Sequence, residues 1–255
     1  MNRSIYILFF TIILFSSCAS KKDILYFQDA ANYPSVSVNP SQTAIQANDI
    51  LSITVSALVP ETAIPYNIQN FSSVMAAQNI ETMKLQGYLV SQEGTIIFPV
   101  LGKISVEGKT ISAIEQNIKA ILDQGGHLVN PTVIVRILNA KVTILGEVNR
   151  PGTYTFSEQF ISLPQALGYA GDLTINGKRN DILLIRQLEG VRTIMHLDLT
   201  TANWMNDPKY AIKQNDVLVI NPNNPKIKTA GYIGNSSAIL TIASLILSSI
   251  VLLTR

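Results

Sequence analysis

The side chains that most often carry catalysis are scarce in this chain. It has one cysteine, Cys18, and two histidines, His127 and His196, which lie far apart in the sequence. A single cysteine cannot form an intramolecular disulfide, and zinc sites usually take several Cys or His ligands. Carboxylates such as Asp172 and Asp181 could serve a glycosidase as acid and nucleophile, but their glycine and asparagine neighbours are typical of turns. We therefore predict that the protein is not an enzyme and has no metal site and no cofactor.

Composition excludes further classes of protein. The 255 residues include 19 Lys and Arg against 17 Asp and Glu, a formal net charge of +2. Nucleic-acid binders usually carry a clustered basic face, so this balance predicts no nucleic-acid partner. Charged residues make up 14% of the chain, whereas about 25% is typical of soluble domains. Hydrophobic residues reach 47%, which excludes disorder over most of the length and indicates membrane-associated segments.

Only part of one nucleotide-binding motif is present in the sequence. Gly108-Lys109-Thr110 matches the end of a phosphate-binding loop, but Lys103 stands where that motif needs its first glycine. We therefore predict no nucleotide site.

The first 17 residues have the three parts of a secretory signal peptide. Met1-Asn2-Arg3 is a short positive start, an apolar run extends from Ile5 to Phe15, and Ser16-Ser17 precede a cleavage point. The apolar run is too short to cross a bilayer comfortably. Cys18 follows directly, as in a bacterial lipoprotein signal, although leucine is more usual than Phe15. We predict that Cys18 becomes the mature N-terminus and that several acyl chains anchor it stably.

A second apolar segment lies near the other end of the sequence. From Thr229 to Thr254 there is no charged residue, and 238–253 is almost wholly apolar or hydroxylic. A helix of this length spans about 24 Å, close to the roughly 25 Å apolar band of outer-membrane proteins. We predict a transmembrane helix over 238–253. The alternative is a buried helix of a soluble core.

Small and hydroxyl side chains recur along one face of this segment. Successive spacings of 4, 3, 4, 3 and 4 separate Ala230, Gly234, Ser237, Thr241, Ser244 and Ser248. At about 100° per residue these positions form one narrow stripe, opposite large apolar side chains. The stripe serves either close packing of helices with hydroxyls bonding across the contact, or a water-filled lumen lined by a ring of copies. Both hypotheses require a homo-oligomer. The candidate residues for pore lining or helix packing are Ser237, Thr241, Ser244 and Ser248.

The body of the chain predicts an α+β fold. Strand patterns occur near 51–55, 95–98, 132–137, 141–148, 182–187, 193–197 and 217–220. A helical period covers 110–122, started by Thr110 or by a Ser112–Glu115 capping box and ended by Gly125-Gly126. A shorter helix is predicted at 163–169. We also predict a hairpin between 87–90 and 95–98. The strands are short and mostly hairpin-linked, with one helix in each group.

Two segments of the body resemble each other. Residues 45–53 and 212–220 each carry Asn-Asp in the middle, as Asn48-Asp49 and Asn215-Asp216. In both, a turn made by this pair delivers the chain into a strand. We therefore predict two small β-rich modules of one β-grasp-like type.

Several runs in these modules form a recognisable set. The first module contributes Asn48–Ile53, Gly87–Val90, Glu93–Gly102, Gly108–Thr110 and Asn130–Val133. The second contributes Val142–Val148, Arg150–Tyr154, Ala166-Leu167 with Ala170-Gly171, and Asn215–Val219. Together they resemble the outer-membrane polysaccharide export lipoproteins, which serve capsule and exopolysaccharide secretion. The start, Cys18–Lys22 with Tyr26-Phe27-Gln28, is similar to that of Bacteroidetes members.

The resemblance implies a domain organisation. It divides the chain into a signal peptide (1–17), a lipidated tether with little structure (18–44), a polysaccharide export domain (45–139), a soluble-ligand-binding β-grasp (SLBB) domain (140–222), a hinge (223–237) and the membrane helix (238–253). Long family members carry a second SLBB domain, whereas this chain has room for one.

The resemblance also implies a function. Family members stack as rings whose lumen passes the glycan, which predicts an oligomeric channel for capsular or exopolysaccharide in the outer membrane. The body is then periplasmic, with outer-membrane lipid and an inner-membrane polysaccharide co-polymerase or tyrosine autokinase as partners. Ala19-Ser20 contains no aspartate that would retain a lipoprotein at the inner membrane. The alternative is a non-conducting, lipid-anchored glycan-binding adaptor of the same machinery.

Overall fold

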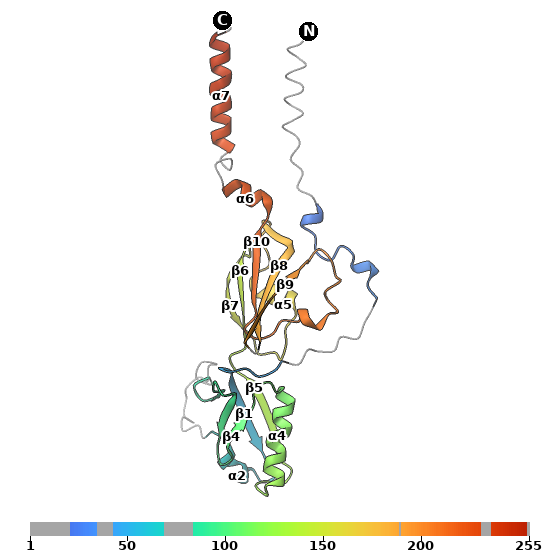
Figure 1. Cartoon of the computed structure of the whole chain (residues 1–255), viewed down its shortest axis with the longest axis vertical. Coiled ribbons are helices and arrows are strands. Elements are labelled where there is room, and N and C mark those ends of the chain that lie inside the picture. The colour runs from blue at the N-terminus through green and yellow to red at the C-terminus, as the bar shows by residue number, and fades with distance from the viewer. Residues whose placement is uncertain (1–20, 35–42, 69–83, 189, 231–235, 254–255) are drawn as a thin grey trace.

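The structure of the chain is a computed structural model that describes residues 21–34, 43–68, 84–188, 190–230 and 236–253. Figure 1 shows two β-rich domains along the long axis of the molecule, with two helices beyond the second. We call residues 43–138 the first domain and 140–222 the second domain. Cys18 lies outside the described residues.

The first domain contains two small sheets and one long helix. Its strands are β1 (Ile50–Ser56), β2 (Tyr88–Leu89), β3 (Thr95–Phe98), β4 (Gly102–Ser105) and β5 (Thr132–Ile137). Its helices are α2 (Pro60–Ala63), the 3-10 helix η3 (Ile64–Tyr66) and α4 (Ile111–Gln124). One sheet has the order β2-β1-β5 and the other is the pair β3-β4. Alternate residues of β1, such as Leu51 and Ile53, are buried, as their period of two predicts.

The hairpin predicted between 87–90 and 95–98 is wrong. β3 pairs with β4, so that Thr95 faces Ser105, whereas β2 pairs with β1. A turn separates β2 from β3, in which Gly94 N–H donates to Ser91 O over 3.0 Å with Gly94 at φ +70°. This turn carries the chain from one sheet to the other, which local turn chemistry alone does not reveal.

Helix α4 begins and ends where the sequence predicts. The Thr110 hydroxyl accepts the Ala113 N–H over 3.2 Å, so Thr110 is the cap rather than Ser112. Gly126 adopts φ +70° after the last turn, a conformation that suits glycine. The buried face runs through Ile114, Ile118 and Leu122. These residues recur every four positions, and the face packs the helix on its own domain core.

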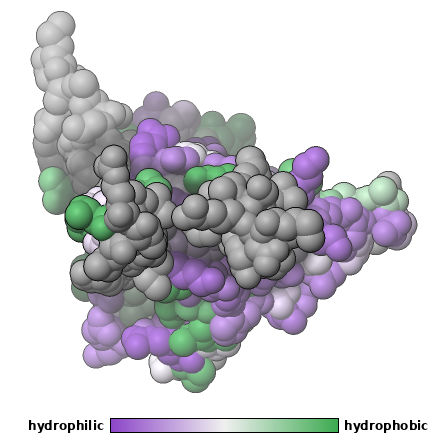
Figure 2. Space-filling view, turned by 90° about the horizontal axis from the view of Figure 1, so that it is seen from above, coloured by the Kyte–Doolittle hydropathy of each residue, from purple (hydrophilic) through white to green (hydrophobic). Residues whose placement is uncertain are grey.

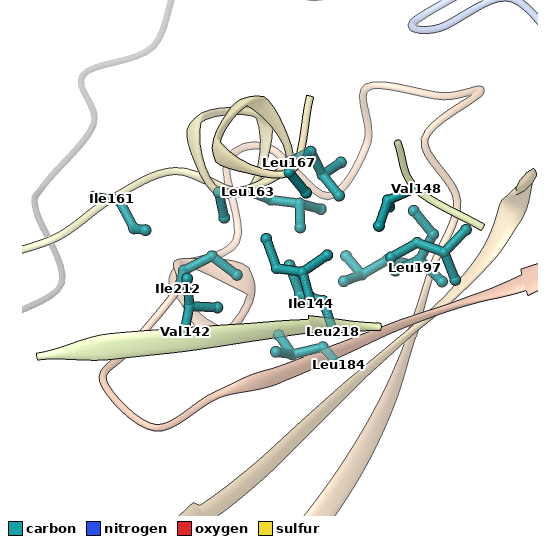
Figure 3. Close-up of a cluster of buried hydrophobic side chains, with 14 of the residues drawn as sticks. Val142, Ile144, Val148, Ile161, Leu163, Leu167, Leu184, Leu197, Ile212 and Leu218 are labelled. Carbon is teal, nitrogen blue, oxygen red and sulfur yellow. The ribbon is translucent and has the colours of Figure 1, made fainter. Parts of the chain in front are cut away.

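The second domain is one five-stranded sheet covered by a short helix. Its elements are β6 (Lys141–Gly146), β7 (Gly152–Thr155), α5 (Leu163–Tyr169), β8 (Gly177–Leu188), β9 (Val191–Leu197), the 3-10 helix η4 (Pro208–Tyr210) and β10 (Val217–Pro222). The order is β7-β6-β10-β8-β9, with only the β6–β10 pair parallel. Figure 3 shows Leu163 and Leu167 over Ile144 and Leu218 of the central strands, and all four are buried. This mixture of sheets and helices confirms the predicted α+β class.

The two predicted turns have the same geometry. Asn48 and Asn215 adopt φ +70° and +64°. The carboxylate of Asp49 accepts the Gln46 N–H, and that of Asp216 accepts the Lys213 N–H, each over 2.7 Å. Both turns are followed by a strand with buried alternate residues. The internal similarity in the sequence therefore corresponds to one repeated local structure.

The C-terminal region differs from the prediction. The hinge predicted over 223–237 contains helix α6 (Asn224–Ala230), so Ala230 belongs to a different helix from Thr241, Ser244 and Ser248, and Gly234 lies outside the described residues. Helix α7 (Ser236–Leu253) lies where a helix was predicted. Within the described residues, however, no helix combines the length and hydrophobicity needed to cross a membrane. The expectation of a transmembrane helix at 238–253 is therefore not supported. Five serines and one threonine interrupt its apolar sequence.

Each of the two domains buries its own cluster of hydrophobic side chains. Viewed along the long axis, the coloured surface in Figure 2 is mostly hydrophilic, with hydrophobic residues in smaller separate groups. Such separate groups are ordinary on a protein surface.

A buried ion pair ties the second turn to its sheet. Arg186 on β8 donates to both carboxylate oxygens of Asp216, over 2.9 and 2.7 Å. Its other donors reach the carbonyl oxygens of Lys209 and Ala211. Both charged side chains are almost fully buried, so each depends on the other for compensation of its charge.

We predict that Arg186→Met destabilises the second domain strongly. Asp216 would then be a buried carboxylate without a cation, and such losses cost about 3–5 kcal/mol. Thermal and denaturant unfolding of the detergent-solubilised full chain, followed by circular dichroism, measures the change. Arg192→Met, on the exposed part of β9, is the matched control and should change stability by less than about 0.5 kcal/mol. Equal losses in the two variants would contradict the assigned role of the pair.

The corresponding carboxylate of the first turn has no cationic partner among the described residues. Asp49 is buried, and its Oδ2 accepts the Gln214 amide N–H over 2.5 Å. Burial raises the pKa of Asp49, and this effect exceeds the opposing effect of the hydrogen bonds from Gln46 and Gln214. The folded chain therefore holds the Asp49 proton more tightly than the unfolded chain does.

We predict that Asp49→Asn is more stable than the wild type at pH 7. The contribution of Asp49 to stability is greatest when it is protonated, and it declines as pH rises from the unfolded pKa of about 4 through the raised folded pKa. The advantage of the variant should therefore shrink as pH falls toward 4. Melting temperatures measured from pH 4 to 8 check this.

Asp207→Asn is the control for this pH series. Its hydrogen bond from Lys209 lowers the pKa of Asp207, so any effect of that change has the opposite sign. The prediction fails if the stability of Asp49→Asn relative to the wild type is lower at pH 7 than at pH 4.

Candidate functional site

The segment that follows the predicted lipidation site is folded onto the second domain. The backbone N–H groups of Phe27 and Gln28 donate to Leu199 O and Thr200 O over 3.0 and 2.8 Å. Asp29 accepts the Ala202 N–H over 2.7 Å. We call residues 24–32 the strap. The sequence predicted a tether with little structure here, and local polarity gave no sign of these distant backbone partners.

Aromatic side chains hold the strap in place. Phe27 packs against the second-domain core, and its ring centroid lies 6.1 Å from that of Trp204. The Tyr26 hydroxyl donates to Asp172 over 2.7 Å, and the Arg179 guanidinium lies 5.2 Å from the Tyr26 ring centroid. Burial, followed by the bond to Asp172, raises the pKa of Tyr26 to about 12. The phenol therefore stays a hydrogen-bond donor at all physiological pH values.

The predicted stripe lies on the surface of α7. Thr241, Ser244 and Ser248 are exposed, and the spacings of three and four residues place them on one helix face. The side chain of Ser237 is outside the described residues. Large apolar side chains of the same helix are also exposed, among them Leu240, Ile242, Leu245 and Leu252. The helix thus presents an apolar surface interrupted by a hydroxyl stripe.

The hydroxyls of the stripe bond to their own helix. Ser244 Oγ donates to Thr241 O over 2.8 Å, and Ser248 Oγ donates to Ser244 O. Each proton is therefore satisfied within the helix, a pattern common for serine in apolar helices. The oxygen lone pairs remain as acceptors, and the small side chains leave room for a neighbouring backbone.

The carboxylates considered for catalysis have structural partners. Asp172 accepts from the Tyr26 hydroxyl and from the Leu173 N–H. Asp181 accepts from Lys178 over 2.8 Å and from His196 over 2.6 Å, and the bond to Lys178 is the main cause of the lowered pKa of Asp181. The acid of a glycosidase needs a raised pKa. The pKa of Asp181 is lowered instead, so Asp181 does not suit that role. Among the described residues, no three His, Cys, Asp or Glu side chains gather as a metal site requires.

Single aromatic residues occupy structural positions. Trp204 is buried, and its indole N–H donates to Thr201 O over 3.0 Å. Tyr154 stacks on Tyr169 with an interplanar angle of 14°. The Tyr66 hydroxyl lies 3.1 Å from His127 Nδ1. Trp204 and His127 therefore have partners that explain their positions without a ligand.

Comparison with protein families assigns both domains. Residues 37–138 match the model described as polysaccharide biosynthesis/export protein, and residues 141–196 match the SLBB domain. The chain belongs to the polysaccharide export family. This family is not a family of enzymes. The predicted likeness to Bacteroidetes members in particular stays a prediction.

Two named relatives of this export-family chain come from Ralstonia. The EPS I polysaccharide export outer membrane protein EpsA of Ralstonia solanacearum is 25% identical over 201 residues, which cover 77% of this chain and 52% of the relative. The protein of the same name from Ralstonia nicotianae is 32% identical over 147 residues, 56% of this chain and 38% of the relative. The chain thus spans about half, or less, of the curated relatives it matches.

Sequence reasoning missed two features of this export-family chain. The buried contact of Gln214 with Asp49 joins residues 165 positions apart, and no periodicity in the sequence reports such a pairing. The strap was also missed. Its only sequence signal was the short apolar run Ile24-Leu25-Tyr26-Phe27 between Asp23 and Gln28.

We predict that Phe27→Ala releases the strap. The loss of its packing on the second-domain core removes the aromatic contact that holds residues 24–32. Trypsin should then cleave the full chain after Lys21 or Lys22 several-fold faster, as measured by mass spectrometry over time. Leu25→Ala is the matched control, because Leu25 is 54% exposed. Equal cleavage rates in the Phe27→Ala variant and the wild type would show that the backbone contacts alone hold the strap.

Proposed function

We propose that this chain is an outer-membrane lipoprotein that exports polysaccharide. In this proposal, acyl chains on Cys18 anchor it, copies of the chain assemble into a ring, and the ring passes a capsular or exopolysaccharide across the outer membrane. The observation that carries the proposal is the presence of an export domain and an SLBB domain in one chain. The names of the two Ralstonia relatives support the same role and location.

The arrangement of the described residues supports a membrane-proximal end. The strap lies on the second domain, and α6 leaves the last strand of the same domain. Figure 1 shows α6 and α7 at the end of the molecule opposite the first domain. We propose that the second domain faces the membrane and that the first domain extends into the periplasm. An inner-membrane polysaccharide co-polymerase or tyrosine autokinase would meet it there and supply the polymer.

We further propose that α7 is the assembly helix of the ring. Leu240, Leu245 and Leu252 are 70%, 61% and 80% exposed, and an apolar surface of this kind indicates a contact with lipid or protein. The hydroxyl protons of Ser244 and Ser248 are already satisfied, so a neighbouring helix can approach the stripe without losing hydrogen bonds. These contacts favour helix packing along Ser237, Thr241, Ser244 and Ser248 over lining of a water-filled lumen.

We predict that Ser244→Leu with Ser248→Leu breaks the oligomer. Leucine at these positions fills the space through which neighbouring helices approach. The assembly in detergent should shift to smaller species in multi-angle light scattering. Ser249→Leu is the matched control, because Ser249 lies on the same helix about 100° from Ser248 and also bonds to its own helix, at Leu245 O. An oligomer of unchanged size in the double variant would remove the stripe from the interface.

Conductance distinguishes a channel from a non-conducting adaptor. The purified oligomer in planar bilayers should pass ions. The same current from the Ser244→Leu, Ser248→Leu variant, if that variant still assembles, would exclude the pore-lining hypothesis. No current from intact oligomer would favour the lipid-anchored glycan-binding adaptor.

Deletion of the gene tests the proposed function directly. Cells without the chain should lose surface polysaccharide while they retain polymer inside, as measured by staining of intact and lysed cells. The Cys18→Ser variant should restore little export, because the thiol that takes the lipid is absent. It should also leave the outer-membrane fraction. Unchanged surface polysaccharide in the deletion strain would refute the export function.

A further inference from the structure

A cavity of about 330 Å³ lies at the junction of the two domains. Val135 and Arg136 of the first domain line one part, and Phe156, Glu158 and Gln214 of the second domain line another. Ligand sites in proteins commonly measure about 300–1,000 Å³ and lie between domains. The size of this cavity suits a short saccharide segment rather than a long polymer.

Gln214 supplies a buried acceptor without a donor. Its amide nitrogen donates to the Asp49 carboxylate, which fixes the orientation of the amide group. The amide oxygen, Oε1, is then buried and accepts no hydrogen bond from the described residues. This oxygen has no exposed surface and does not face the cavity, so Gln214 contributes to the site by holding the two domains together through Asp49.

Two charged side chains line the same cavity. The side chain of Arg136 is exposed, and no hydrogen bond or ion pair joins its guanidinium to another described residue. Glu158 accepts only the neighbouring Ser157 N–H among the described residues, so its carboxylate keeps free acceptor positions. The cavity therefore offers the guanidinium donors of Arg136 and the carboxylate acceptor of Glu158.

We infer that the junction cavity binds an acidic sugar unit. A uronosyl residue carries a carboxylate, which Arg136 can bind through two parallel hydrogen bonds. Its ring hydroxyls can donate to the carboxylate of Glu158. Its apolar ring face can lie against the part of Phe156 that lines the cavity. This inference rests on the proposed export function, because it names the class of glycan that the chain contacts.

Binding of a defined disaccharide tests the inference. Full-length protein in detergent, with labelled isoleucine methyl groups, is titrated with cellobiouronic acid while the signals of Ile111 and Ile137 are followed by NMR. Both residues line the cavity. We expect saturable shifts of these signals. The neutral disaccharide cellobiose should bind about tenfold more weakly, because it lacks the carboxylate.

Matched variants locate the site. Arg136→Gln should weaken cellobiouronic acid about tenfold, and Glu158→Gln should weaken it to a smaller extent. Arg192→Gln, on β9 and not among the cavity residues, should bind like the wild type. The inference is overturned if the signals do not shift, if Arg136→Gln binds normally, or if cellobiose binds as tightly as the acid.

A parallel cell assay keeps this test separate from the export function. Deletion cells that carry Arg136→Gln are stained for surface polysaccharide beside cells that carry the wild type. If the variant exports normally and binds the disaccharide like the wild type, the proposed sugar site in the cavity is refuted. The proposed export function is not affected by that result. Unchanged surface polysaccharide in the deletion strain itself refutes the export function, whatever the disaccharide does in solution.

Discussion

The hydrogen bond between Gln214 and Asp49 joins two turns of the same design, one from each domain. Asn139, in the short link between β5 and β6, completes the junction by accepting from Ile50 N–H and donating to Asn48 O, each over 2.9 Å. These contacts fix how the domains meet, because they bind the start of β1 from two sides. The buried carboxylate of Asp49 is stabilised only by neutral hydrogen-bond donors in the described residues. Loss of any one of these donors would leave it poorly solvated, so the junction depends on all of them.

The Asn48-Asp49 and Asn215-Asp216 turns share one local structure, but the charges of their carboxylates are compensated in different ways. In the second domain Arg186 neutralises Asp216, so that turn is a closed electrostatic unit within one core. In the first domain Asp49 has only neutral donors, one of them from the other domain. The first turn therefore depends on the domain junction, whereas the second turn does not. The orphaned oxygen of Gln214 is a direct consequence, because an amide that gives its nitrogen to Asp49 must leave its oxygen elsewhere.

The two ends of the molecule have different roles in the proposed function. The strap and the helices beyond β10 gather at the second domain, while the first domain lies at the far end (Figure 1). In the proposed export lipoprotein, this division separates attachment and assembly from contact with the incoming polymer. The two domain matches and the named relatives support the export role itself.

The sequence by itself determined the features that depend on neighbours in the chain. Periodicity and capping placed α4 and α5 and most strands, and the Asn-Asp pairs located both turns, because backbone preference and local hydrogen bonds decide these elements. Only the tertiary structure decided the pairing of β3 with β4, the strap on the second domain, and the meeting of Asp49 with Gln214. Each of these joins groups whose partners are set by the packing of whole domains, and their sequence separations carry no periodic signal. The chemistry of the junction cavity follows from that packing, since Arg136 and Gln214 line one cavity only when the two domains are in contact.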